Sequence, residues 1–119
     1  MGKINIKVTI KNAEGLNNYV VPAIYDDDNK TIIYKEPDED KTTVKFNFTT
    51  KSLDRENTSL IMKYKFNKEK NSEGIIYVKG MNRKFYVTIK TIKMIKDNNN
   101  IDIDYQIEND KFTYKIEVI

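Results

Sequence analysis

The stretch that decides the fold runs from residue 101 to residue 118 and reads IDIDYQIENDKFTYKIEV. Apolar side chains occupy every second position on both sides of Asn109-Asp110, which is the period of two that a half-buried β-strand requires. If Asn109-Asp110 is a two-residue hairpin turn, Ile107 lies opposite Phe112. Apolar residues then face each other on one side and acids face bases on the other. We therefore expect an antiparallel hairpin here.

The same alternation predicts further strands along the rest of the chain. They cover residues 4–10, 19–25, 31–36, 42–49, 60–66, 75–78 and 85–94. The polar stretches 12–18 and 54–58 are predicted to be loops. Pro22 lacks a backbone donor, so it places its strand at an edge, a bulge or a kink. No segment has a sustained helical period, and we expect no helix longer than a turn or two.

The segment 85–94 carries a change of phase. Its apolar residues stand at odd positions up to Ile89 and at even positions from Ile92 onward, so the pattern slips near Lys90-Thr91. A slip of one residue is the signature of a β-bulge, which bends a long strand. Eight or nine short strands with such a bend predict an all-β, closed antiparallel barrel, since closure removes exposed edges.

Composition restricts the function. The chain has 119 residues, which we interpret as one domain over 1–119, and it contains neither histidine nor cysteine. Disulfides, thiolate zinc sites and imidazole-based catalysis are therefore excluded. The first residues alternate polar and apolar and resemble neither a signal peptide nor a membrane span. We expect a cytoplasmic, bacterial-type protein that does not contact a membrane.

Two kinds of acidic cluster could carry chemistry. The loops 26–28 and 36–40 are rich in carboxylates but lack the spacing of a calcium loop, so we interpret them as solvated turns and expect no metal and no cofactor. Asp102 and Asp104 share one strand face, and their alternation with isoleucine indicates the solvated side of a sheet. We predict no catalytic residue and no enzyme activity.

Several short segments together resemble a known family. They are Ile33-Tyr34-Lys35-Glu36, Lys41 to Phe46, Leu53-Asp54-Arg55, Leu60 to Tyr64, Val87 to Thr91 and Ile101 to Tyr105. In order and spacing these segments resemble the bacterial YwiB-like family of calycin-type barrels. The resemblance implies an eight-stranded, lipocalin-like barrel and a family whose function is unassigned.

The candidate ligand site lies among the residues of that resemblance. Arg55 stands out because it is one of only two arginines, and its rigid fork can hold a carboxylate or phosphate at a barrel mouth. An alternative role for Arg55 is to pack across the barrel end and cap backbone carbonyls. The predicted ligand-binding residues are Tyr34, Glu36, Arg55, Met62 and Tyr64.

Two function hypotheses follow. The leading one is a non-enzymatic protein that binds a small apolar or amphipathic ligand in the barrel or at its mouth; the barrel interior is either open or filled. The alternative is a protein- or nucleic-acid-interaction module that uses the outer surface. We do not expect nucleic acid to be the partner, because lysines 63 and 65 alternate with inward-facing aromatic residues. Exposed strand edges would favour a homodimer, and the sequence leaves this open.

Overall fold

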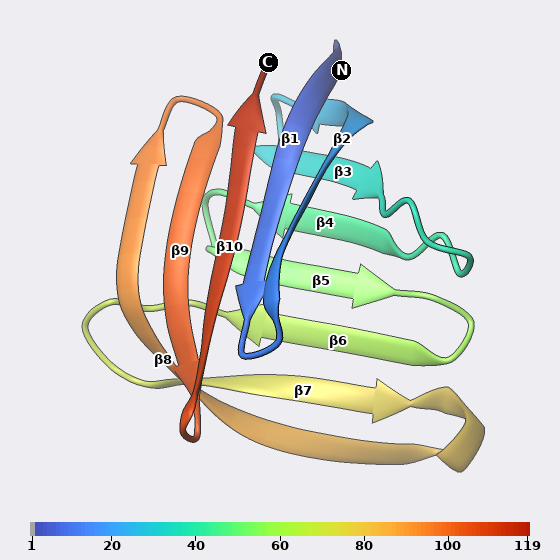
Figure 1. Cartoon of the computed structure of the whole chain (residues 1–119), viewed down its shortest axis with the longest axis vertical. Helices are drawn as coiled ribbons and strands as arrows, with labels where there is room; N and C mark the ends of the chain where they lie inside the picture. Colours follow the sequence, from blue (N-terminus) through green and yellow to red (C-terminus); the bar gives the residue numbers. More distant parts are fainter. Residues whose placement is uncertain (1) are drawn as a thin grey trace.

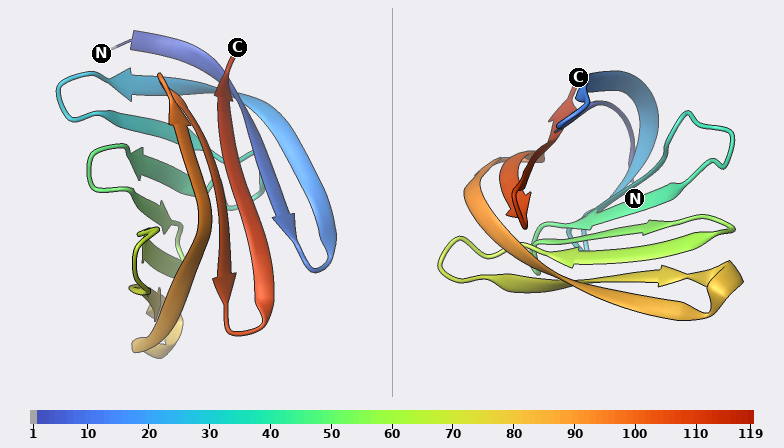
Figure 2. Two further views of the ribbon diagram at one scale, coloured as in Figure 1. Left: turned by 90° about the vertical axis from the view of Figure 1, so that its left-hand side faces the viewer. Right: turned by 60° about the horizontal axis from the view of Figure 1, so that its bottom comes forward.

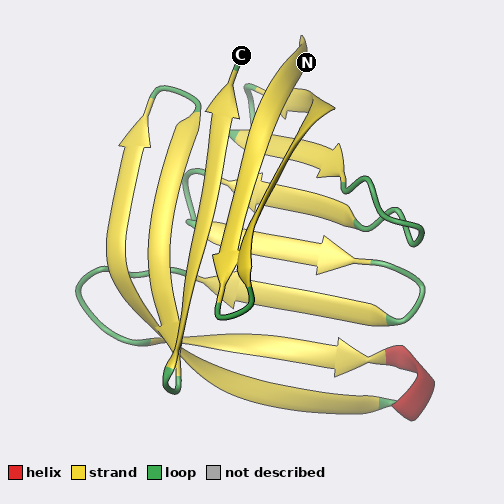
Figure 3. Ribbon diagram, viewed as in Figure 1, coloured by secondary structure: helices red, strands yellow, loops and turns green. Residues whose placement is uncertain are grey.

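The computed structural model describes residues 2–119, which form ten antiparallel strands and one short 3₁₀ helix (Figures 1 and 3). The elements are β1 (Gly2–Asn12), β2 (Gly15–Asp26), β3 (Thr31–Lys35), β4 (Thr43–Asn47), β5 (Ser52–Glu56), β6 (Leu60–Lys65), β7 (Ser72–Val78), η1 (Lys79–Met81), β8 (Arg83–Asp97), β9 (Asn100–Ile107) and β10 (Asp110–Val118). Each strand pairs with its neighbours in sequence, and β10 pairs with β1. The predicted closed all-β barrel is confirmed.

The barrel consists of two sheets whose strands cross. In Figure 1 the strands β9, β10 and β1 run vertically in front, and β3 to β7 run horizontally behind them. The two longest strands, β2 and β8, belong to both sheets because each bends from one direction to the other (Figures 1 and 2). Pro22 lies in β2 one position before its pairing with β3 begins at Ala23. These two bends are the corners at which the barrel closes.

A bulge produces the bend in β8. Thr91 pairs with Tyr105 and Lys93 pairs with Asp104, so Ile92 is an extra residue that has no partner in β9. Thr91 is buried and Met94 faces the core, whereas Ile92 is exposed. The phase slip predicted near Lys90-Thr91 is therefore confirmed, and the extra residue is Ile92, which directly follows them.

The interior is filled by the inward-facing side chains of the alternating strands. Three aromatic contacts link the sheets near the centre: Phe46 with Tyr114, Tyr64 with Tyr105, and Phe66 with Tyr105. The fully buried apolar side chains are Ile6, Val8, Ile32, Val44, Phe46, Ile89, Ile103 and Ile116. Within residues 2–119, no helix is long and apolar enough to cross a bilayer.

The strand count differs from the prediction of eight or nine. The missed strand is β5, whose sequence Ser52-Leu53-Asp54-Arg55-Glu56 has one apolar residue and so shows no alternation. Its inward positions hold Leu53 and Arg55, and an inward arginine hides the strand pattern. The predicted loop 12–18 is also wrong, because β2 begins at Gly15 and leaves only a two-residue turn.

The last hairpin is present with a different register. Asp110 pairs with Ile107 and Phe112 pairs with Tyr105, so the turn consists of Glu108 and Asn109, not Asn109-Asp110. Glu108 adopts the left-handed conformation with φ of 56°. The observed register differs from the predicted one by two residues. Because side chains alternate with a period of two, the apolar residues of both strands still share one face.

We predict that Gly74→Ala lowers the free energy of unfolding by about 1–3 kcal/mol through overpacking. A Cβ at this position would lie 2.7 Å from Tyr64 Cδ1 and 2.9 Å from Val87 Cγ2. Chemical denaturation followed by circular dichroism measures the change. Gly80→Ala is the matched control, because nothing lies within 4 Å of its Cβ position. Equal stabilities of the two variants would contradict the proposed close packing at Gly74.

Candidate functional site

One row of paired residues crosses the back sheet and carries most of the predicted site. The row joins Tyr34 of β3, Val44 of β4, Arg55 of β5, Met62 of β6, Ile76 of β7 and Phe85 of β8. All six belong to the inward-facing set of their strands. The row places the predicted residues Tyr34, Arg55 and Met62 on the same inner wall.

Arg55 forms an ion pair with Glu36, the residue that follows β3. Glu36 is only 8% exposed, and it also accepts a hydrogen bond of 3.2 Å from the Tyr19 hydroxyl. A buried carboxylate needs such partners because burial without them is costly. The side chain of Arg55 remains 33% exposed, and its Nε has no hydrogen-bond partner within residues 2–119. The ion pair thus lies at the boundary between the core and solvent.

The pKa of Arg55 reflects two opposing influences. Burial, the larger single influence, lowers the pKa, but the hydrogen bond and the negative charge of Glu36 together outweigh it. The result is a pKa raised above its usual value, so this guanidinium stays charged at every accessible pH. Within residues 2–119, the hydrogen-bond partner of the Arg55 side chain is Glu36, and no backbone carbonyl accepts a hydrogen bond from it, in contrast to the alternative role as a carbonyl cap.

A second polar contact lies deeper, where the hydroxyls of Tyr34 and Tyr114 are 2.7 Å apart and buried. Burial raises the pKa of both phenols, as it does for Tyr19 and Tyr105. Neutral hydroxyls that donate and accept are therefore the stable form inside this barrel.

The five predicted residues all lie on the inner wall. Tyr34, Glu36 and Arg55 belong to the polar cluster just described, and Met62 pairs with Arg55. Tyr64 lies one inward position from Met62; burial raises the pKa of its phenol, although the charge of Arg55 opposes this.

Sequence reasoning missed two members of the cluster, Tyr19 and Tyr114. Tyr19 alternates with Val21 and Ala23, which placed it inside, but nothing in the sequence linked it to Glu36. Tyr114 contacts a residue eighty positions away, and such a contact has no local signal.

The barrel is open at the end where this row terminates. Residues 15–22 of β2 pair only with β1, and residues 83–88 of β8 pair only with β7, among the strands described. In the right-hand view of Figure 2 the two sheets diverge towards the β7–β8 turn. Phe85 faces inward there but is 43% exposed, and Arg83 lies over its ring at 5.6 Å. The inner wall is thus accessible to solvent at this end.

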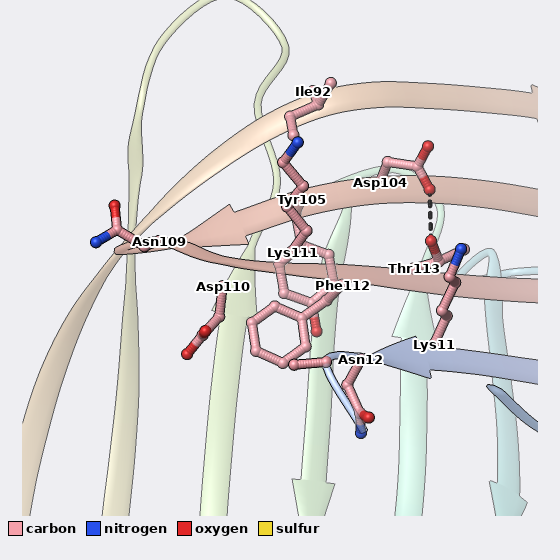
Figure 4. Close-up of a pocket in the computed structure, with 11 residues that line it drawn as sticks. Lys11, Asn12, Ile92, Asp104, Tyr105, Asn109, Asp110, Lys111, Phe112 and Thr113 are labelled. Atoms are coloured by element: carbon pink, nitrogen blue, oxygen red, sulfur yellow. Dashed lines mark hydrogen bonds between the residues drawn. The ribbon is translucent and has the colours of Figure 1, made fainter. Parts of the chain in front are cut away.

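Two of the hollows on the surface lie away from this end. The larger, of about 550 Å³, lies between the β1–β2 and β9–β10 turns (Figure 4). Its lining includes two lysines and two aspartates, and the rings of Tyr105 and Phe112 stack beside it at 5.2 Å. The other, of about 440 Å³, lies on the outer wall where β2 meets β3 and is mainly apolar. Neither is lined by Glu36 or Arg55.

The acidic clusters have structural partners. Lys93 Nζ lies 3.2 Å from Asp102 and 3.5 Å from Asp104, and Asp104 also accepts a hydrogen bond from Thr113. In the loops, Asp26 caps its own turn and Asp38 accepts two hydrogen bonds from Thr42. No group of acidic side chains suited to a metal occurs within residues 2–119.

Fold and site together define a closed antiparallel barrel that carries a tyrosine-rich polar cluster and is open at one end. Residues 4–117 match a family described as a domain of unknown function, DUF1934, and the chain belongs to this family. The expectation of a β-barrel family of unassigned function is confirmed. No curated protein and no solved structure is matched.

We predict that Tyr34→Phe lowers the free energy of unfolding by about 1–3 kcal/mol, because it leaves the buried Tyr114 hydroxyl without its partner. Tyr114→Phe should cost a similar amount. The double variant should lose clearly less than the sum of the two single losses, since no orphaned hydroxyl remains. Urea denaturation of the parent, the two single variants and the double variant measures the four free energies of unfolding that this double-mutant cycle needs. Additive losses would show that the two hydroxyls do not interact.

We also predict that alkaline pH unfolds the barrel. The pKa of the buried tyrosines is raised above the usual 10.0, so folding holds them neutral and their contribution to stability is complete below pH 10. The free energy of unfolding then falls as pH rises towards the folded-state pKa, since only the unfolded chain can ionise these phenols. Tyrosinate absorbance and circular dichroism, recorded together, should show a late ionisation phase that coincides with unfolding. Ionisation of all eight tyrosines in a chain with a native spectrum would refute this.

Proposed function

We propose that this protein binds a small apolar or amphipathic molecule at the open end of the barrel. The observation that carries the proposal is the exposure of Phe85, an inward-facing aromatic residue that the barrel leaves 43% exposed. An apolar ring facing the interior is normally covered, and its burial by a ligand would be favourable by the area removed from water. Ile76, which is half-buried, continues the same apolar surface on the next strand, and the buried Met62 lies behind it.

The polar cluster supports the proposal at the same end. Arg55, Glu36 and Tyr19 hold one another in place, so donors and an acceptor are fixed before any ligand arrives. Fixed polar groups at the edge of an apolar surface are the usual arrangement of small-molecule sites. The predicted residues Tyr34 and Tyr64 form the deeper wall behind them.

The resemblance to the YwiB-like, calycin-type barrels agrees with this proposal, since lipocalin-like barrels hold one small ligand. In this proposal the protein is a non-catalytic binding protein of the bacterial cytoplasm. The absence of histidine and cysteine from the sequence favours binding over catalysis.

A second candidate function is docking of a protein on the outer wall. Leu16, Val20 and Ile24 are exposed along the outer face of β2, and the apolar hollow of about 440 Å³ adjoins Ile24. Nucleic acid is less favoured as a partner, because Tyr64 and Phe66 are buried and cannot stack on bases. A homodimer through this face is one form of the second candidate, and light scattering at two protein concentrations detects it.

We predict that the folded protein binds 1-anilinonaphthalene-8-sulfonate and that Phe85→Ala weakens this binding about five- to tenfold, through loss of one aromatic contact. Fluorescence titration of the folded protein measures the dissociation constant. Tyr86→Ala is the matched control, because the side chain of Tyr86, the residue next to Phe85, faces outward and is 62% exposed. It should bind the dye like the parent.

Two outcomes would count against the proposal. The first is a parent protein that does not bind the dye, and the second is equal weakening by Phe85→Ala and Tyr86→Ala. Native mass spectrometry of protein purified from its own organism is the companion measurement, because it reports a co-purified molecule and the oligomeric state together.

A further inference from the structure

The two arginines of the chain lie on the same inner wall. Arg55 is in the row that ends at Phe85, and Arg83 is one inward position beyond Phe85, where it pairs with Val78. The chain uses lysine at nineteen other positions. Both of its planar, bidentate cations thus lie at the open end, where a ligand would meet them.

The wall between the two arginines is apolar. Met62 and Ile76 separate Arg55 from Phe85 along the row, and Leu60 and Val78 lie one inward position further out. Neighbouring strands are about 4.8 Å apart, so the row from β5 to β8 is roughly 14 Å long. This is a surface for a short hydrocarbon chain or a flat ring system with a cation at either end.

The charges on this wall do not cancel. In the described part of the chain, Glu36 is the carboxylate in contact with the cluster, and it is already paired with Arg55. Arg83 has no carboxylate within ion-pair distance among residues 2–119; its guanidinium lies over the Phe85 ring instead. Glu56 of β5 belongs to the opposite face and pairs with Lys79. One guanidinium therefore remains free beside the exposed apolar surface.

We propose that the ligand of the open end is an anionic amphiphile, whose carboxylate or phosphate pairs with Arg83 while its apolar part covers Phe85 and the half-buried Ile76. This inference rests on the proposed function and specifies its ligand class. Arg83 is suited to the role because a guanidinium donates two parallel hydrogen bonds to a carboxylate or phosphate. Its stacking on Phe85 places the cation directly beside the apolar surface, so one molecule reaches both.

The test compares three molecules with the same ten-carbon chain and different head groups. They are decanoate, decyl maltoside and decyltrimethylammonium, each below its micelle concentration and titrated calorimetrically into the folded protein. We expect decanoate to bind about tenfold more tightly than the cation, and we expect added salt to weaken only the decanoate complex. Arg83→Gln should remove most of this preference and weaken decyl maltoside binding much less than decanoate binding.

Two further variants make the result specific to Arg83. Lys84→Gln, the adjacent outward-facing cation, removes the same charge and should keep the preference for decanoate. Arg83→Lys should keep part of it, because the charge remains and the bidentate fork is lost. Circular dichroism confirms that each variant is folded before titration.

The outcomes separate the inference from the proposed function. Equal affinities for the three head groups, or an anion preference that survives in Arg83→Gln, would overturn the inference and leave a ligand site at the open end. Failure of all three molecules to bind the parent, together with no dye binding, would overturn the proposed function itself.

Discussion

The unpaired residue Ile92 is the constraint on which the rest of the barrel depends. A regular antiparallel strand keeps one face towards the core along its whole length, and a strand of fifteen residues would then remain nearly straight. The extra residue lets the first half of β8 pair with β7 and the second half pair with β9 in another direction. Both halves still present their apolar residues to one interior. Without this bend the two sheets would have no shared strand at that corner.

The crossing of the two sheets also explains why polar side chains are stable inside. Inward positions of β3, β5 and β10 meet near one end. Because these strands run in different directions, apolar side chains alone would have to fill an irregular space between them. Long side chains with polar tips meet this requirement: Arg55 reaches Glu36, and Tyr34 reaches Tyr114 across the barrel. The two tyrosine hydroxyls and one terminal nitrogen of Arg55 each have a partner, which lowers the cost of their burial, whereas Arg55 Nε has none within residues 2–119. The same tips define a fixed arrangement of donors and acceptors beside the open end.

Much of this fold could be predicted from alternation alone, because burial of one strand face leaves a period of two in the sequence. Alternation failed where an inward position is polar: Arg55 hid β5 and made the strand count too low. It failed again at the last turn, because a hairpin shifted by two residues satisfies the same apolar pattern, and only the left-handed conformation of Glu108 distinguishes the two registers.

The candidate site was predictable to a similar extent. The inward direction of Tyr34, Met62 and Tyr64 follows from the alternation of apolar and polar residues around them. The alignment of Tyr34 and Met62 in one row depends on the exact lengths of the turns between strands, which the alternation does not determine. The Tyr34–Tyr114 contact depends on closure of the whole barrel, and the exposure of Phe85 depends on where β8 leaves the front sheet. Such properties arise from the three-dimensional arrangement and have no counterpart in a short segment.

The pairing of β1 with β10 has a consequence for the way the chain is made. Ile6 lies opposite Val118, and the backbone N–H of Ile119 donates to the carbonyl of Asn5 at 3.0 Å. During synthesis the outer edge of β1 stays without its partner until β10 has left the ribosome, so closure follows translation of nearly every other strand. The proximity of the two strands also means that a short linker could join them and the chain could be cut at another turn. In a circular permutant opened in the 36–42 loop, β10 and β1 would be made one directly after the other, and the same barrel would form.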